Sequence, residues 1–323
     1  MNISKLQYYA LVPQARETYK NGGNIAAFLR ESLLLDRNTP EVIEIAYDIQ
    51  AGTYIEHLHK YPLMYQNYYT ELAGYLEVYI SKGESLLEVG CGEGTTTLGV
   101  YQKLVNKPSQ ILGFDISFSR VKFATAFWNH QYEKYTRVSG KPNSIAKFFV
   151  ADLFAIPLAD KSIDVVFTSH SLEPNGGREV EALRSIFRVA SKRVLLFEPY
   201  FELASPEGQL RMSSHGYIKK LPEAIAEAGG ILKSVQKIES IQNPLNPTYC
   251  FDIEINSEPT QHSTIWVDPI TFNPLSEQDS CFYCQISGLS YPVIQNIPCL
   301  RPENAIVATR LLDTLNLDAQ KLY

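Results

Sequence analysis

Between residues 81 and about 255, short apolar runs alternate with amphipathic stretches of helical length. Apolar runs of this kind are typical of buried parallel strands, and the stretches between them predict helices that cover the sheet. The alternation therefore predicts a doubly wound parallel sheet of the α/β class. The expected strands lie near 85–90, 110–115, 146–151, 163–169 and 193–198, with two closing strands near 231–240 and 248–255. The expected helices lie near 94–105, 117–132, 177–190 and 215–229.

The regions on either side of this segment have other patterns. Residues 1–80 show helical spacing of apolar positions, with Thr39 and Pro40 as a helix start, and they predict an N-terminal helical cap. Residues 256–323 begin with a polar stretch over 256–263, which we interpret as a linker, and continue as a short, turn-rich module. We therefore divide the chain into a cap (1–80), a central domain (81–255) and a linker with a small ribbon-like module (256–323).

The first expected strand runs into a glycine-rich turn. Gly90, Gly92 and Gly94 alternate with other residues, and a helical pattern follows from Thr95. Glycines at such a turn let a ligand lie against the backbone. Asp115 ends the next strand, about 20 residues further on, where a carboxylate can accept hydrogen bonds from ribose hydroxyls. The pattern predicts a nucleoside-containing cofactor.

The spacing of the turn separates two classes of cofactor. The dinucleotide fingerprint is G-x-G-x-x-G, whereas this chain has G-x-G-x-G with Glu88 before it and Glu93 inside it. Two carboxylates would repel a pyrophosphate and would suit a ligand with positive charge. A nicotinamide-dependent oxidoreductase is therefore disfavoured.

At this point the sequence resembles the class I S-adenosylmethionine-dependent methyltransferases. Their first motif is matched by Glu88 and the glycine turn, their second by Asp115, and their third by Asp152, which follows the apolar run 148–151. The run 162–169 is similar to their fourth strand. The resemblance implies a Rossmann-like, seven-stranded mixed sheet, S-adenosylmethionine as cofactor and methyl transfer as the reaction.

The same resemblance implies a set of cofactor-binding residues. Tyr47 and Tyr54 resemble an aromatic lid signature in the N-terminal helices, although tyrosines at helical spacing also pack interfaces. We expect the cofactor to contact Tyr54, Glu88, Gly90, Cys91, Gly92, Gly94, Asp115, Ile116, Asp152, Leu153 and Ser169.

Candidate catalytic residues follow the fourth and fifth expected strands. His170 titrates near neutral pH and is our candidate general base; the alternative is a hydrogen-bonding role within its loop. Glu173, Glu198 and Tyr200 are candidates for the substrate pocket. We place His215 at a helix start, where capping competes with a catalytic role.

The composition of the chain bears on which class of molecule accepts the methyl group. The chain has 323 residues, 45% hydrophobic and 20% charged, and a formal net charge of −6. The negative charge disfavours a nucleic-acid substrate, and no apolar stretch could span a membrane, so a cytoplasmic protein is expected.

Our first hypothesis is methyl transfer to oxygen or nitrogen of a small molecule, such as a sugar or a natural-product intermediate. The alternatives are an RNA or protein acceptor, and a non-catalytic module that binds S-adenosylmethionine and regulates a partner. The oligomeric state is not indicated.

The C-terminal segment is similar to small zinc-ribbon proteins that activate methyltransferases. The likeness lies in residues 268–275 and 287–298, but the chain has one C-x-x-C pair, Cys281 and Cys284, with Asp268 and Thr271 where the other pair would stand. A structural zinc site needs four ligands. We therefore assign no metal and expect a ribbon held by apolar packing, although whether the cysteine pair binds zinc stays open. Five cysteines in this length do not indicate a disulfide scaffold.

Overall fold

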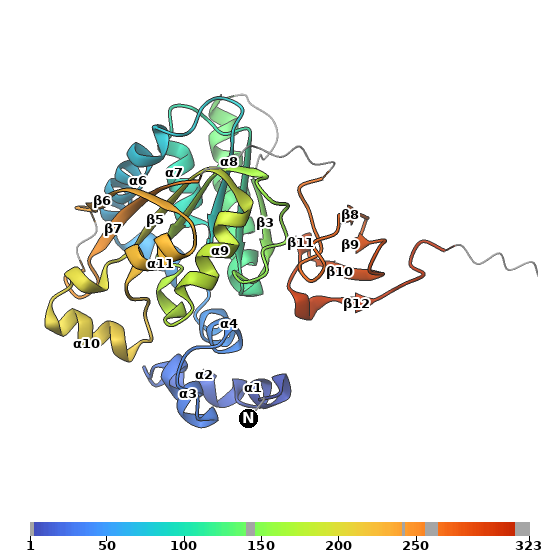
Figure 1. The fold of residues 1–323 in the computed structure, drawn as a ribbon, viewed down its shortest axis with the longest axis horizontal. Coiled ribbons are helices and arrows are strands. Elements are labelled where there is room, and N and C mark those ends of the chain that lie inside the picture. Colours follow the sequence, from blue (N-terminus) through green and yellow to red (C-terminus); the bar gives the residue numbers. More distant parts are fainter. Residues whose placement is uncertain (1–2, 140–145, 241–242, 256–263, 314–323) are drawn as a thin grey trace, which may run out of the picture.

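The computed structural model describes residues 3–139, 146–240, 243–255 and 264–313. The proposed linker at 256–263 lies outside the described residues. A seven-stranded sheet with the order β3-β2-β1-β4-β5-β7-β6 forms the centre of the molecule (Figure 1), and β7 runs antiparallel to both of its neighbours. Its strands are β1 (Ser85–Val89), β2 (Gln110–Asp115), β3 (Ala146–Val150), β4 (Ile163–Ser169), β5 (Ala190–Pro199), β6 (Ile231–Lys237) and β7 (Thr248–Glu254).

The predicted doubly wound, mixed sheet of seven strands is confirmed. Alternate side chains of each strand enter separate cores because strand side chains alternate between faces. Leu86 faces α6 and α7, while Leu87 faces α9 and α11. The helices around the sheet are α7 (Thr95–Lys103), α8 (Phe118–Ser139), α9 (Glu179–Val189), α10 (Pro206–Ser214) and α11 (Leu221–Glu227), with short 3₁₀ turns η1 (Glu173–Asn175) and η2 (Phe201–Leu203).

The helix predicted over 215–229 is wrong in its extent. Only α11 lies within this range, because α10 ends at Ser214 and residues 215–220 between the two helices are not helical. Gly216 and Lys220 both have positive φ, at 71° and 51°, a conformation that interrupts a right-handed helix. His215 is accordingly the C-terminal cap of α10 and not a helix start.

Residues before the sheet form helices, as the apolar spacing predicts. They are α1 (Lys5–Ala10), α2 (Val12–Lys20), α3 (Ile25–Leu33), α4 (Pro40–Ile49), α5 (Thr53–Lys60) and α6 (Pro62–Glu77). The first four pack around their own small core and lie below the sheet in Figure 1, whereas α6 packs on a sheet face. The Thr39 hydroxyl accepts a hydrogen bond from the Val42 N–H, which confirms the predicted start of α4.

The C-terminal residues form a small antiparallel sheet beside β3 (Figure 1). Its strands are β8 (Ser276–Glu277), β9 (Cys281–Cys284), β10 (Leu289–Ile294), β11 (Ile297–Pro298) and β12 (Ile306–Val307), with a 3₁₀ turn η3 (Pro302–Asn304). We call residues 264–313 the C-terminal module. Trp266 stacks edge-on against both Phe149 of β3 and Phe282 of β9, so the module shares the main core of the central sheet.

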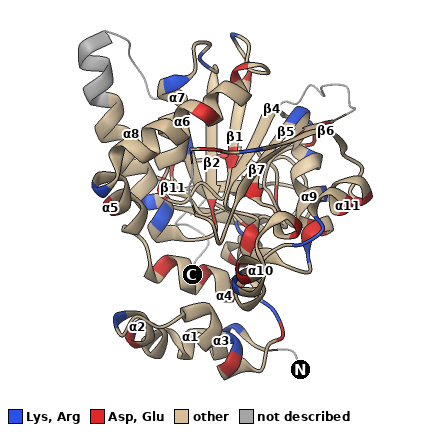
Figure 2. Ribbon diagram, turned by 90° about the vertical axis from the view of Figure 1, so that its left-hand side faces the viewer, with Lys and Arg blue, Asp and Glu red and all other residues tan. Residues whose placement is uncertain are grey.

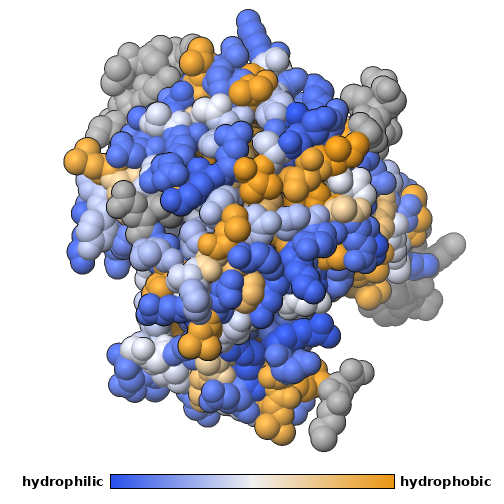
Figure 3. All heavy atoms as spheres, turned by 60° about the vertical axis from the view of Figure 1, so that its left-hand side comes forward, coloured by the Kyte–Doolittle hydropathy of each residue, from blue (hydrophilic) through white to orange (hydrophobic). Residues whose placement is uncertain are grey.

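The charged residues of both signs, and the hydrophilic and apolar residues, are interspersed over the molecule. Lys and Arg alternate with Asp and Glu over the face in Figure 2, and hydrophilic residues predominate in Figure 3, with apolar residues gathered in small patches between them. Within the described residues, no helix has the length and apolar character needed to cross a bilayer.

Candidate functional site

The glycine turn has the strand-to-helix geometry that the sequence predicts. Gly90, Gly92 and Gly94 all have positive φ, and Gly94 caps the N-terminus of α7. A Cβ at Gly90 would lie 2.3 Å from the Cβ of Ser171, and one at Gly92 would lie 3.1 Å from the Tyr54 ring. The positive φ favours glycine at both positions, and at Gly90 there is also no space for a Cβ.

A cavity with an empty volume of about 680 Å³ lies beside the turn, at the carboxyl ends of the strands. This is where open α/β sheets bind ligands. The structure brings most of the predicted cofactor residues to its wall: Tyr54, Gly90, Gly92, Asp115, Ile116, Asp152, Leu153 and Ser169. Tyr47, Phe154 and Arg120 line it as well.

Asp115 and Asp152 supply two buried carboxylates to this cavity. Asp115 accepts hydrogen bonds from the backbone N–H of Gly92 at 3.0 Å and of Ser117 at 2.9 Å. Burial raises the pKa of Asp115, against the opposing effect of Arg120 and these donors. Burial also raises the pKa of Asp152, whose Oδ1 accepts from the Phe154 N–H. Each carboxylate is fixed by backbone donors and keeps acceptor capacity toward the cavity.

Three residues predicted to touch the cofactor do not line the cavity: Glu88, Cys91 and Gly94. The Glu88 carboxylate accepts a hydrogen bond from the Thr97 hydroxyl in α7, and burial raises the pKa of Glu88 to about 8. Burial therefore favours the neutral form of this carboxyl, and its hydrogen bond runs to α7 and not to the cavity. A negative charge offered by Glu88 to a cationic ligand stays a prediction.

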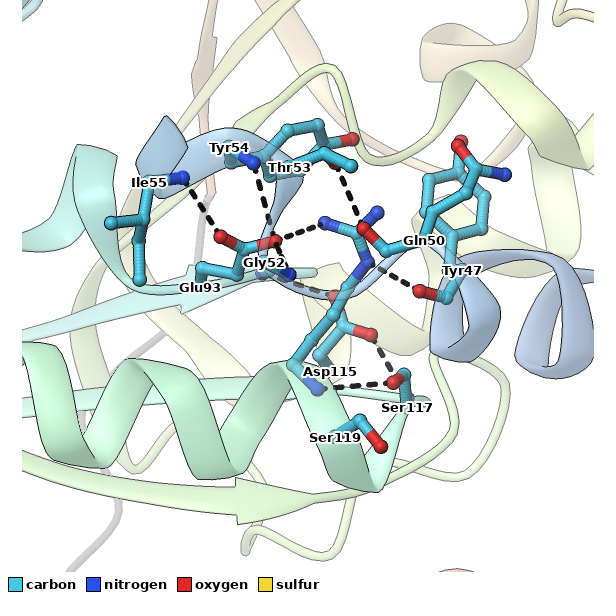
Figure 4. Close-up of polar contacts among 12 residues, drawn as sticks. Tyr47, Gln50, Gly52, Thr53, Tyr54, Ile55, Glu93, Asp115, Ser117 and Ser119 are labelled. Carbon is cyan, nitrogen blue, oxygen red and sulfur yellow. Dashed lines mark hydrogen bonds and ion pairs between the residues drawn. The ribbon is translucent and has the colours of Figure 1, made fainter. Parts of the chain in front are cut away.

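Glu93 also has a partner within the protein. Its Oε1 lies 3.1 Å from Nη1 of Arg120, and neither side chain is exposed (Figure 4). The same carboxylate accepts hydrogen bonds from the N–H groups of Gly52 and Ile55, both at 2.8 Å, at the start of α5. Its charge therefore holds the cap and does not face the cavity.

Arg120 completes a stack with the two lid tyrosines. Its guanidinium carbon lies 4.1 Å from the ring centre of Tyr54 and 5.0 Å from that of Tyr47, and its Nε donates to the Tyr47 carbonyl at 2.9 Å (Figure 4). Tyr47 and Tyr54 both line the cavity, as the lid pattern suggests. Arg120 was not predicted, because its role depends on three segments that meet only in the fold.

His170 lies at the cavity wall in a loop that follows β4. Its φ of 56° is left-handed, its Nδ1 lies 3.2 Å from Glu173 Oε2, and its Nε2 lies 2.9 Å from Thr248 Oγ1. Burial disfavours the charged ring, but the hydrogen bond with Glu173 and the charges of Glu173 and Glu198 raise the pKa of His170 above its usual value. Both ring nitrogens are occupied, so the structure supports the loop-bonding alternative and leaves the role as a base a prediction.

The other catalytic candidates lie apart from the 680 Å³ cavity. Glu198 is fully buried and accepts from the N–H groups of Ser171 and Leu172, both at 3.0 Å, and burial raises its pKa to about 7. Glu198 therefore fixes the backbone of the loop that carries His170. Tyr200 packs edge-on against Tyr249, away from the cavity wall.

Glu173 lines a second cavity, which has an empty volume of about 1020 Å³. This space lies between the cap, η1 and the end of α10, and it shares Ile43, Tyr47, Tyr54 and Pro174 with the first cavity. Its wall also includes Tyr19, Asn24, His215 and Tyr217. Burial and the positive charge of Arg211 lower the pKa of His215, which favours the neutral ring.

The sequence model for "Methyltransferase domain" matches residues 80–245, more than half of the chain. The chain belongs to this methyltransferase family. It is an enzyme of the methyltransferase class, and its cofactor is S-adenosylmethionine. The two buried carboxylates, the glycine turn and the aromatic lid around the first cavity fit a ligand with ribose hydroxyls and an adenine amino group. No curated protein sequence matches this methyltransferase.

Solved structures share parts of the fold at low sequence identity. A complex between the Haloferax volcanii Trm112 methyltransferase activator and a methyltransferase matches at 15% identity and a TM-score of 0.49, covering 68% of this chain and 100% of that chain. Geranyl diphosphate C-methyltransferase from Streptomyces coelicolor, solved with S-adenosyl-L-homocysteine, matches at 10% identity and a TM-score of 0.44, with coverages of 57% and 76%. The [4+2]-cyclase SpnF matches at 20% identity and a TM-score of 0.42, with coverages of 53% and 60%, so this chain spans less than two thirds of that protein.

Asp268 joins two parts of the C-terminal module. Its carboxylate accepts hydrogen bonds from the Ser287 hydroxyl at 2.7 Å and the Tyr291 hydroxyl at 2.8 Å. Cys281 and Cys284 are free thiols at the two ends of β9. Among the residues that the structure describes, no three His, Cys, Asp or Glu side chains gather as a metal site would require.

Proposed function

We propose that this methyltransferase transfers the methyl group of S-adenosylmethionine to an oxygen or nitrogen of a small molecule held in the second cavity. The observation that carries the proposal is that the two cavities adjoin, because Ile43, Tyr47, Tyr54 and Pro174 line both of them. A donor in the first cavity and an acceptor in the second would lie next to each other at these residues. The mixed charges in Figure 2 suit a small acceptor better than a phosphate backbone.

In this proposal the first cavity holds the cofactor through the residues that line it. Asp115 would accept from the ribose hydroxyls and Asp152 from the adenine amino group, while Tyr54, Gly90, Gly92, Ile116, Leu153 and Ser169 shape the wall. Glu88, Cys91 and Gly94 would act indirectly, by forming the turn. Bound S-adenosylmethionine supplies the activated methyl carbon. The chain supplies alignment of the acceptor and a destination for its proton.

The pair of His170 and Glu173 is the proposed destination for that proton. His170 lines the first cavity and Glu173 the second, so the pair spans the boundary where transfer would occur. Asn246 donates to Glu173 Oε2 at 3.1 Å and orients the carboxylate. We assign His170 the role of base and Glu173 the role of the group that orients it. Glu198 is proposed to hold the loop that carries His170 through its hydrogen bonds to that loop, and Tyr200 to stabilise the end of β5 by packing.

A second candidate function is suggested by the C-terminal module. Its sequence is similar to activators of methyltransferases that act on RNA and protein, and it packs directly on the central sheet. If the module were a fused activator, a macromolecular acceptor would be favoured.

One experiment separates these candidates. The purified protein is incubated with methyl-labelled S-adenosylmethionine and with separate metabolite, RNA and protein fractions of a cell extract, and the labelled products are identified by mass spectrometry. Label in the metabolite fraction supports the proposal, and label confined to RNA or protein overturns it in favour of the second candidate. No labelled product in any fraction, despite tight binding of S-adenosylhomocysteine, would count against both acceptor classes.

A further inference from the structure

The C-terminal module contacts the central sheet close to the first cavity. The Leu300 N–H donates to the Val150 carbonyl at 2.8 Å, and Cys299 pairs with Val150 in parallel register. Val150 ends β3, two residues before Asp152 of the cavity wall. The next residue of the module, Arg301, is therefore delivered beside the cofactor cavity without lining it.

Arg301 turns from the sheet toward the cap. Its Nη1 lies 2.5 Å from Glu44 Oε2 in α4, and its Nε lies 3.4 Å from Glu303 within the module. The Arg301 side chain is 2% exposed and that of Glu44 is 26% exposed, so water screens this ion pair poorly. Burial would lower the pKa of Arg301, but Glu44, Glu303 and Asp152 together raise it, so the guanidinium stays charged.

Helix α4 carries two further contacts to the site, one turn from Glu44. Asp48 accepts hydrogen bonds from the Ser117 hydroxyl at 2.7 Å and the Ser119 N–H at 2.9 Å, at the start of α8. Tyr47 lines both cavities. Residues three and four positions apart lie on one side of a helix, so Glu44, Tyr47 and Asp48 face the central domain together. On this face of α4, the ion pair with Arg301 fixes the position of Glu44, and the hydrogen bonds to Ser117 and Ser119 fix the position of Asp48.

We propose that Arg301 is a positioning residue through which the C-terminal module sets the orientation of α4, and with it the Tyr47 wall of the cofactor cavity. The module then acts as a built-in support for cofactor binding, in addition to covering the edge of β3. This inference rests on the proposed assignment of the first cavity to the cofactor. If the competent orientation of the cap becomes tenfold less populated, the apparent affinity for cofactor falls by the same factor.

The test compares two ion pairs that the module makes with the rest of the chain. Glu44→Gln removes the charge that Arg301 binds on the cap, and it leaves Arg301 paired with Glu303. Glu277→Gln is the matched control, because Glu277 binds Lys147 of β3 at 2.8 Å in an exposed pair that does not involve the cap. S-adenosylhomocysteine affinity is measured by calorimetry, and hydrogen exchange is measured over residues 40–55 and 297–304.

We expect Glu44→Gln to weaken S-adenosylhomocysteine binding by about tenfold and Glu277→Gln to leave it unchanged. In the unaltered protein, saturating S-adenosylhomocysteine should slow exchange in residues 297–304, which do not line the cavity, and Glu44→Gln should abolish that protection, because coupling is reciprocal.

Equal affinity in the unaltered and Glu44→Gln proteins would overturn the inference, as would an equal loss in both variants. If Glu44→Gln does not fold, the ligand-dependent protection of 297–304 in the unaltered protein decides the question, and its absence counts against the inference. A lack of S-adenosylhomocysteine binding by the unaltered protein would instead refute the proposed function.

Discussion

Glu93 and Arg120 form an ion pair in which Oε1 and Nη1 lie 3.1 Å apart, and both side chains are shielded from solvent. Glu93 belongs to the glycine turn and Arg120 to α8, while the same carboxylate binds the backbone of Gly52 and Ile55 in the cap. The pair therefore joins three segments that are distant in sequence. A charge inside the glycine turn thus fixes the start of α5 and, through the bond from Arg120 to the Tyr47 carbonyl, α4 as well.

Replacing Glu93 by Gln should lower the free energy of unfolding by up to about 3–5 kcal/mol, because the buried Arg120 would lose its ion-pair partner and keep only the attraction of Asp115. Urea unfolding followed by circular dichroism measures the change. Glu17→Gln is the control, since it breaks the exposed pair of Glu17 with Lys20, and it should cost less than about 1 kcal/mol. Similar losses in the two variants would show that the buried pair has no special weight.

The sequence predicts the central sheet well because its signals are local. The apolar runs and the glycine turn lie within single elements, and each is found where expected. The helix over 215–229 fails because Ile218 donates its N–H to the Glu173 carbonyl, a distant contact that competes with helical bonding. The partners of Glu88 and Glu93 could not be predicted either, because a carboxylate beside a turn looks the same whether it faces a ligand or Arg120.

Asp115→Ala should weaken S-adenosylhomocysteine binding by about 1.5–3 kcal/mol, the scale of hydrogen bonds to a charged group. The structure adds a second consequence, because the N–H groups of Gly92 and Ser117 would lose their acceptor. Calorimetry measures the affinity, and a urea titration shows whether the variant is folded. Asp36→Ala, at an exposed position, should leave the affinity as it is. An unchanged affinity in Asp115→Ala would remove Asp115 from the proposed site.

His170→Ala should reduce turnover by about 10²–10⁴-fold, the range for loss of a general base, with a much smaller effect on cofactor affinity. A base must be neutral to accept a proton, so turnover should rise with pH through a pKa above 6.5. Glu173→Gln removes the main group that raises this pKa, so the rise should move to lower pH. The measurement is the pH dependence of label transfer to the acceptor. A profile that Glu173→Gln leaves in place would contradict the pairing of these residues in catalysis.

Glu88→Gln tests whether the turn is built on a neutral carboxyl. Burial raises the pKa of Glu88 from 4.5 to about 8 in the folded protein. The folded state therefore holds more protons than the unfolded state between these values, and this group's contribution to stability is fully present below pH 4.5 and is lost as pH rises toward 8. A Gln side chain cannot ionise and still accepts from the Thr97 hydroxyl. The stability of Glu88→Gln relative to the unaltered protein should thus increase from pH 5 to pH 8, by up to about 1.4 kcal/mol per pH unit, and then level off.

Urea unfolding of both proteins at a series of pH values measures this difference in stability. Glu198→Gln provides the comparison, because the pKa of Glu198 rises only to about 7 and its difference should level off one unit earlier. A difference that does not vary with pH would mean that Glu88 is ionised in the folded protein, and the turn would then present a negative charge after all.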